Sequence, residues 1–158
     1  MITIRLYTDS DAPFLASIFR DSVRVLGRRA YTRAQVRAWL QGTPDATETR
    51  ARCSDGRTTF VADDGSGQPV GFIDLEPDGH IDLFYVAPDV AGQGVAKSLY
   101  NALETVAVRD GLERLYVEAS EVAKGFFDRQ GFIVSKRRDF DIQGVPIHNY
   151  AMEKTLGP

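Results

Sequence analysis

Two glycines mark the point where an apolar stretch gives way to an amphipathic one, in the segment Asp89–Ala96, DVAGQGVA. Glycine permits tight turns and lets backbone N–H groups approach a ligand without side chains in the way. A helix that follows such a turn begins with unpaired N–H donors and the positive end of its dipole. The segment therefore predicts an anion site suited to phosphate, with a purely structural turn as the alternative.

The elements on either side of this loop follow from hydrophobic spacing. His80–Val86 is rich in β-branched and aromatic residues, which predicts a buried strand, and Pro88 ends it. The helix beyond the loop is predicted from apolar residues at steps of three and four, namely Val95, Leu99, Leu103 and Val106. Neither common nucleotide motif, GxxxxGK(S/T) or GxGxxG, occurs here.

Length and composition limit the class of protein. The 158 residues, 43% hydrophobic and 26% charged, predict one domain spanning 1–158 with a substantial core. A formal net charge of −3 provides no general attraction for nucleic acid or an anionic membrane. The single cysteine, Cys53, supplies no disulfide or metal cluster, and we expect no metal. Without a leader pattern or an apolar run of about 20 residues, we expect a cytoplasmic protein.

Periodicity and turn residues predict the other elements. These are a strand at 2–6, helices at 14–23 and 33–40, a hairpin of 58–62 with 70–75, a strand at 115–118, a helix ending at Gly131, and a hairpin of 132–141 with 147–152. Residues from Gly42 to Gly56 carry only a weak signal. The three middle strands should be antiparallel because they follow one another as a meander. This order is α+β, with a central mixed, mostly antiparallel sheet of about seven strands and helices on both faces.

Two motifs resemble those of the GCN5-related N-acetyltransferases (GNAT). Ala91–Ala96 resembles motif A, Gln/Arg-x-x-Gly-x-Gly/Ala, which binds the pyrophosphate of acetyl-CoA, although Ala91 lacks the usual side chain. Ser120–Phe132 resembles motif B, Asn/Ser-x-x-Ala-x-x-Phe-Tyr-x-x-x-Gly-Phe. The element order is also similar over nearly the whole chain. The chain looks most like small bacterial members of the YafP type, which share its GHID strand, FF pair and MEK ending.

The resemblance implies the acyl-CoA N-acyltransferase fold and a site for acetyl-CoA. Backbone groups of Phe84, Tyr85 and Val86 would pair with the pantetheine arm as with an added strand. The residues implied at the pyrophosphate are Ala91, Gly92, Gln93, Gly94, Val95, Ala96 and Lys97. Ser120 would contact the cofactor or cap its own helix, and the two roles are compatible. Phe127 stands where the family often has a tyrosine that protonates the departing thiolate, and phenylalanine has no such proton.

Acetyl transfer from a thioester to an amine needs a neutral amine, a polarised carbonyl and a supported thiolate. With an ordinary pKa of about 6.5, histidine suits the base, and His80 matches the position of a catalytic glutamate in histone-acetylating members of the family. Asp82, on the same strand face, would orient the imidazole or act through water. Glu76 is the alternative base, and Tyr85 and Tyr150 are candidate acids. A surface histidine and a turn carboxylate are the structural alternatives for His80 and Glu76.

The sequence thus predicts an acetyl-CoA-dependent N-acetyltransferase that transfers the acetyl group directly, in a ternary complex, to a primary amine of a small molecule or protein. His148 and Asn149, on the last strand, would line the acceptor pocket. An acyl-CoA-binding or regulatory module without turnover is the alternative, motivated by Ala91 and Phe127. We expect an amine partner, no nucleic acid and no membrane, and exposed strand edges would permit a homodimer.

Overall fold

The computed structural model describes residues 1–157, whose strands form two four-stranded sheets. The strands are β1 Thr3–Leu6, β2 Thr58–Asp63, β3 Pro69–Leu75, β4 His80–Ile81, β5 Phe84–Val86, β6 Arg114–Ala119, β7 Ile133–Ile142 and β8 Val145–Thr155. The α-helices are α1 Ala12–Leu26, α2 Arg33–Leu40, α3 Ala46–Cys53, α4 Val95–Arg109 and α5 Lys124–Arg129. One sheet has the order β1-β2-β3-β5 and the other β4-β6-β8-β7.

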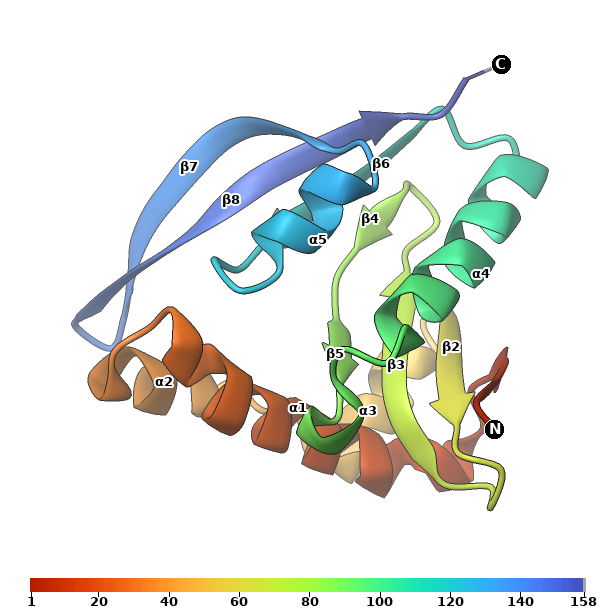
Figure 1. Cartoon of the computed structure of the whole chain (residues 1–158), viewed down its shortest axis with the longest axis horizontal. Coiled ribbons are helices and arrows are strands. Elements are labelled where there is room, and N and C mark those ends of the chain that lie inside the picture. The colour runs from red at the N-terminus through yellow and green to blue at the C-terminus, as the bar shows by residue number, and fades with distance from the viewer. Residues whose placement is uncertain (158) are drawn as a thin grey trace.

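The strand predicted to run unbroken through His80–Val86 is interrupted at Asp82 and Leu83, and its two halves belong to different sheets. β5 pairs antiparallel with β3, which confirms that part of the predicted meander. β4 instead pairs parallel with β6. Figure 1 shows the hairpin of β7 and β8 arching over α5. In the same view, β5 runs away from this hairpin toward α1. The α+β class with mostly antiparallel pairing is confirmed.

A charged network holds the strand interruption. The backbone N–H groups of Asp82 and Leu83 each donate to Asp74 Oδ1 at 3.0 Å. Arg57 Nη1 donates to Asp74 Oδ2 and to Asp82 Oδ2, both at 3.0 Å, and Arg52 donates to the same Asp82 oxygen. Asp74 is only 3% exposed, and burial raises the pKa of its carboxyl group. Side chains therefore supply the bonds that a regular strand would make through its ladder.

Helices cover both faces of the first sheet, as predicted. On one face, α4 packs on β2 and β3 and buries the expected apolar residues Val95, Leu99 and Leu103 at 2% exposure or less. On the other face, α1 packs on β3 and places Leu15 and Ile18 in one core cluster with Phe72. The loop before α4 is therefore held by a helix anchored in the core.

Helix α3 lies in the segment that carried only a weak sequence signal. Glu48 N donates to Asp45 Oδ1 at 2.8 Å, and Asp45 N donates back to Glu48 Oε1 at 3.3 Å, so the helix begins with a capping box. Within α3 only Thr49 is buried, and hydrophobic periodicity could not reveal such a helix. No helix among residues 1–157 combines the length and apolar character needed to span a membrane.

We predict that Asp74→Ala lowers the unfolding free energy by about 3–5 kcal/mol, because it leaves the N–H groups of Asp82 and Leu83 without an acceptor and removes one of the carboxylates that pair with Arg57. The Arg57 side chain is 6% exposed, so water cannot replace the carboxylate freely. Urea unfolding measures the loss. Asp21→Ala is the control, since Asp21 is only partly buried and pairs with exposed Arg24, and it should cost less than about 1 kcal/mol. Equal losses would show that the network does not hold the interruption.

Candidate functional site

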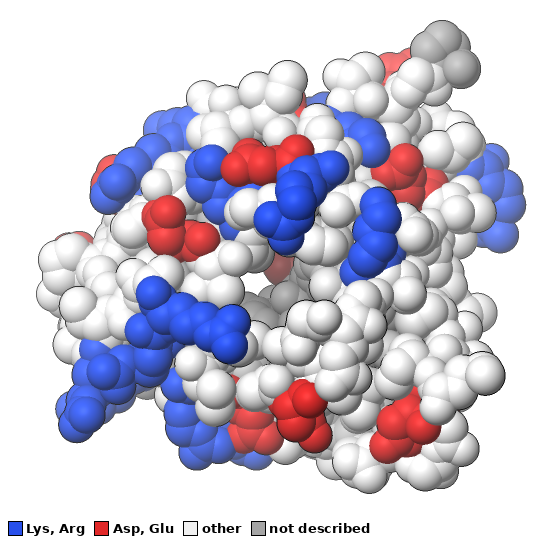
Figure 2. Space-filling model, in the orientation of Figure 1, with Lys and Arg blue, Asp and Glu red and all other residues white. Residues whose placement is uncertain are grey.

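A cavity of about 490 Å³, here called the first cavity, lies between β5, the loop before α4, and α5. Figure 2 shows a hollow near the middle of this face, with Lys and Arg side chains around it. Lys97 of α4 and Arg129 of α5 are among the lining residues, and both carry positive charge. Helix α1 contributes a further wall through Ser22 and Leu26.

The loop before α4 presents unpaired backbone donors. Gly92 and Gly94 have φ angles of 79° and 82°, which only glycine adopts without strain. Gly94 is the N-cap of α4 and has no side-chain cap, and the first helical bond runs from Ser98 N–H to the Gly94 carbonyl. A Cβ added at either glycine would meet nothing within 4 Å, so open space surrounds the loop. These features fit a group that binds through backbone N–H donors, such as phosphate.

Strand β5 is the free edge of the first sheet and faces the same cavity. The Leu83 carbonyl and the Ala87 N–H both bond to the β3 side. Because antiparallel bonding alternates along a strand, Tyr85 also bonds toward β3, and the backbone groups of Phe84 and Val86 point away from it. An extended ligand can therefore pair with Phe84 and Val86 as an added strand.

A second cavity of about 260 Å³ lies next to the first, on the side of β8. Its polar lining includes Asp82, Glu118, His148 and Asn149, and the two residues expected beside an acceptor, His148 and Asn149, are thus both present. The two cavities share Trp39, Phe84, Tyr85, Ser120 and Ala123. Ligands in the two cavities would therefore meet beside β5.

Most residues that the resemblance implied for the cofactor line the first cavity: Phe84, Tyr85, Val86, Ala91, Gly92, Gly94, Ala96, Lys97 and Ser120. The Ser120 hydroxyl also accepts a hydrogen bond from Ala123 N–H at 3.1 Å, so it caps a turn as well. Phe127 is 1% exposed and borders the second cavity instead. Val95 packs in the core, whereas Gln93 is exposed and donates to the Asp89 carbonyl at 3.4 Å.

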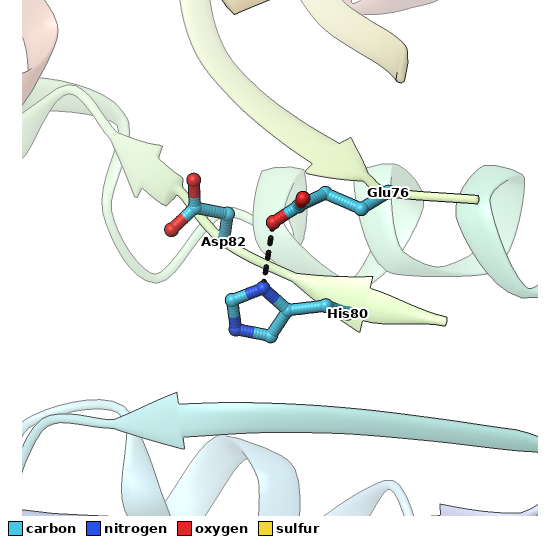
Figure 3. Close-up of side chains that lie close together, drawn as sticks. All are labelled: Glu76, His80 and Asp82. Carbon is cyan, nitrogen blue, oxygen red and sulfur yellow. Dashed lines mark hydrogen bonds and ion pairs between the residues drawn. The ribbon is translucent and has the colours of Figure 1, made fainter. Parts of the chain in front are cut away.

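His80 lies between two carboxylates. Its Nδ1 is 2.7 Å from Glu76 Oε1 (Figure 3), and its Nε2 is 2.8 Å from Glu118 Oε1. The hydrogen bond to Glu118 raises the pKa of His80 to about 9, with burial opposing the shift and Glu76 adding to it. The imidazole is therefore protonated at neutral pH and donates from both nitrogens, which leaves it no lone pair with which to act as a base.

Asp82 and Tyr85 occupy different electrostatic surroundings. Burial opposes ionisation of Asp82, but hydrogen bonds from Arg57 and Arg52 outweigh it and lower the pKa of this carboxyl group. Tyr85 borders both cavities and packs against Phe19 with 4.5 Å between ring centroids. Burial raises the pKa of Tyr85, so its hydroxyl keeps its proton.

Glu76, His80 and Asp82 each have a potential metal-ligand atom within 4.8 Å of the others (Figure 3). These atoms are already engaged, because one Asp82 oxygen accepts from two guanidinium groups and both His80 nitrogens are hydrogen-bonded. A metal ion would have to displace those bonds. The donor set therefore fits a metal poorly.

Glu118 and Glu121 were missed by the sequence reasoning. Glu118 borders the second cavity while holding His80, and Tyr150 OH donates to Glu121 Oε2 at 2.8 Å. His148 Nε2 lies 2.5 Å from the same Glu121 oxygen. Glu118 reaches His80 because β4 and β6 pair in parallel, and pairing between such distant segments leaves no local pattern in the sequence.

We predict that His80 titrates with a pKa of about 9, measured from its imidazole resonances by NMR. Since this pKa is raised on folding, its stabilising effect is complete below about pH 6.5 and is lost as the pH rises through about 9. After allowance for solvent screening, the effect is about 1–2 kcal/mol. Glu118→Gln should lower the pKa of His80, and the exposed control Glu113→Gln should not. A midpoint near 6.5 in the unmodified protein would contradict this arrangement.

Comparison with known sequences places the chain in a family. Residues 28–154 match the model of the acetyltransferase (GNAT) domain. The chain is 30% identical over 151 residues to the uncharacterized N-acetyltransferase YafP of Escherichia coli, covering 96% of this chain and 94% of that protein. It is 37% identical over 87 residues to the peptidyl-lysine N-acetyltransferase YjaB of Salmonella typhimurium, covering 55% of this chain and 58% of that protein.

Solved structures agree with this placement. A GCN5-related N-acetyltransferase from Rhodopseudomonas palustris has a TM-score of 0.89 at 36% identity, covering 98% of this chain and 95% of that one. The PaiA N-acetyltransferase of Thermoplasma acidophilum, solved in complex with coenzyme A, has a TM-score of 0.77 at 19% identity, covering 99% of each chain. The chain belongs to the GCN5-related N-acetyltransferase family and is an acyltransferase.

Proposed function

We propose that this protein is an acetyl-CoA-dependent N-acetyltransferase that acetylates a primary amine, with the lysine side chain as the favoured acceptor. One observation carries the proposal: the two cavities meet at shared residues beside β5, so a donor and an acceptor can react directly in a ternary complex. The similarity to YjaB, a peptidyl-lysine N-acetyltransferase, supports lysine as the acceptor, and the coenzyme A complex of PaiA supports the donor.

The residues of the first cavity fit acetyl-CoA, which would supply the acetyl thioester. The free backbone groups of Phe84 and Val86 would hold the pantetheine arm, and the N–H donors between Gly92 and Lys97 would hold the pyrophosphate. Lys97 and Arg129 bring positive charge to the same cavity. This charge compensates for the Gln or Arg side chain that is usual at the position of Ala91. Single-domain organisation over residues 1–158 and a cytoplasmic location complete the proposal.

Glu118 is the group we assign to the acceptor amine. It borders the second cavity, where it would attract an ammonium group and remove one proton, so that the neutral amine can attack the thioester carbon. The second N–H proton, lost once the C–N bond has formed, passes through solvent to the departing thiolate. Asp82 is disfavoured as the base because hydrogen bonds from two guanidinium groups lower its pKa. His80 is a positioning residue, since it donates to Glu118 at 2.8 Å and to Glu76 at 2.7 Å.

We assign to Tyr85 the support of the departing thiolate, which Phe127 cannot provide. When the C–S bond breaks, the departing sulfur becomes a thiolate that needs a hydrogen-bond donor or a proton from water. The Tyr85 hydroxyl stays protonated and Tyr85 lines both cavities, so in this proposal its hydroxyl donates to the sulfur where the two ligands meet. The thiol's low pKa, relative to that of an alcohol, makes this demand modest.

Release of free thiol from acetyl-CoA in the presence of a lysine peptide tests the function. Gly94→Glu should weaken acetyl-CoA binding about 100-fold, because a carboxylate enters the phosphate site. Gly94→Ala is the matched control: it carries the same backbone strain at φ 82°, meets no neighbouring atom, and should lose less than about tenfold. Equal acetyl-CoA affinity of the Glu variant and the unmodified protein would exclude the loop before α4 as the phosphate site. Acetyl-CoA binding without thiol release would favour the binding module.

Glu118→Gln should lower kcat about 100-fold while acetyl-CoA affinity stays within about twofold, because the amide cannot accept the amine's proton. Steady-state kinetics and calorimetric titration separate the two effects. Glu113→Gln, an exposed carboxylate just before β6, serves as the control and should leave both values unchanged. An unchanged kcat for Glu118→Gln would exclude Glu118 as the base.

A further inference from the structure

Helices α1 and α2 and the 3₁₀ turn between them, η2 Gly27–Arg29, carry a concentration of positive charge. The residues, here called the arginine surface, are Arg20, Arg24, Arg28, Arg29, Arg33 and Arg37, and all six are exposed. Between residues 12 and 40 the only acidic side chain is Asp21. In a protein of net charge −3, this is a strongly uneven distribution.

The charges of the arginine surface are largely uncompensated. Arg24 pairs with Asp21 at 2.5 Å. Within residues 1–157, the other five arginines of the surface take part in no side-chain hydrogen bond or ion pair, whereas Arg5, Arg52 and Arg57 each bind carboxylates. Exposed guanidinium groups without partners are free to bind carboxylates in the bidentate geometry that arginine favours.

The arginine surface lies beside the opening of both cavities. Leu26 and Gly27, next to Arg28, line the first cavity, and Tyr31, between Arg29 and Arg33, lines the second. Figure 2 shows Lys and Arg side chains gathered over α1 and α2 at the lower left, adjacent to the central hollow. A molecule that enters the second cavity therefore passes close to these charges.

Within the part of the chain that the structure describes, the lining of the second cavity contains carboxylates and no Lys or Arg. Asp82 and Glu118 line it, and Glu121 lies beside it through its contact with His148. A lysine ammonium suits this interior, and acidic neighbours of that lysine suit the surface outside. We propose that the arginine surface docks an acidic segment of a protein whose lysine enters the second cavity. This inference rests on the proposed function for the choice of lysine as acceptor.

The charge pattern disfavours nucleic acid as the occupant. A nucleic acid carries phosphate along its whole length, and the part that crossed the cavity opening would meet Glu118 and Glu121. In an acidic peptide with one central lysine, the acidic residues match the arginine surface and the lysine matches the carboxylates of the second cavity. Nor do the phosphates of coenzyme A need the arginine surface, since Lys97, Arg129 and the glycine loop already serve the first cavity.

Binding of two fluorescent peptides to the full chain, with saturating coenzyme A, tests the inference. Both carry one central lysine, with glutamates on either side in one peptide and glutamines in the other. Fluorescence anisotropy at low salt should give at least about tenfold tighter binding of the acidic peptide. At about 1 M salt the difference should largely disappear, since screening acts over about 3 Å there.

Charge reversal locates the effect. Arg28→Glu combined with Arg29→Glu should abolish the preference for the acidic peptide, because both residues are exposed and lie next to the cavity lining. Arg109→Glu combined with Arg114→Glu, at the end of α4 and the start of β6, is the matched control and should keep the preference. An unchanged circular dichroism spectrum and melting temperature establish that each double variant is folded.

Three results would overturn the inference: equal affinity for the two peptides, an unchanged preference after reversal of Arg28 and Arg29, or tighter binding of a single-stranded RNA than of the acidic peptide. Failure of the proposed function is distinguishable from these. If the acidic peptide binds with the expected preference but its lysine is not acetylated, the proposed acceptor is wrong, while the docking surface stands.

Discussion

The site depends on Asp74 accepting the backbone N–H groups of Asp82 and Leu83. A regular strand through these residues would keep the sheets joined, and no edge would face a ligand. Because Asp74 takes those donors, with Arg57 as its counter-charge, β4 can pair with β6 while β5 stays with β3. Burying a carboxylate costs free energy unless it has such partners. The open strand edge therefore depends on the same ion network that stabilises Asp74.

The electrostatics of the two cavities are complementary to two substrates of opposite charge. The first cavity combines backbone N–H donors with Lys97 and Arg129, which suits a phosphate-bearing donor. The second is lined by Asp82 and Glu118, which suits an ammonium group. His80, protonated between Glu76 and Glu118, holds both carboxylates, and the three groups together keep one negative charge in excess. The proposed ternary complex thus forms with each charge matched locally.

The sequence predicted what depends on local pattern. Hydrophobic periodicity predicted the buried face of α4, and the spacing of two glycines predicted the loop before it. Two motifs indicated the family that the comparisons confirm. The interruption at Asp82 could not be predicted, because Asp74 and Arg57 act on it through tertiary contacts. The surroundings of His80 were hidden for the same reason: Glu118 is 38 residues away in sequence. The sequence predicted His80 as the base, whereas we propose Glu118 for that role.

Amide hydrogen exchange at β5 would show whether the open strand edge holds the cofactor. Coenzyme A should slow exchange at Phe84 and Val86, whose N–H groups point away from β3, because the pantetheine arm pairs with them. Exchange at Tyr85 should already be slow without ligand and should change little, since this residue bonds toward β3. Unchanged exchange at Phe84 and Val86 with coenzyme A bound would show that the opened edge is not where the cofactor lies.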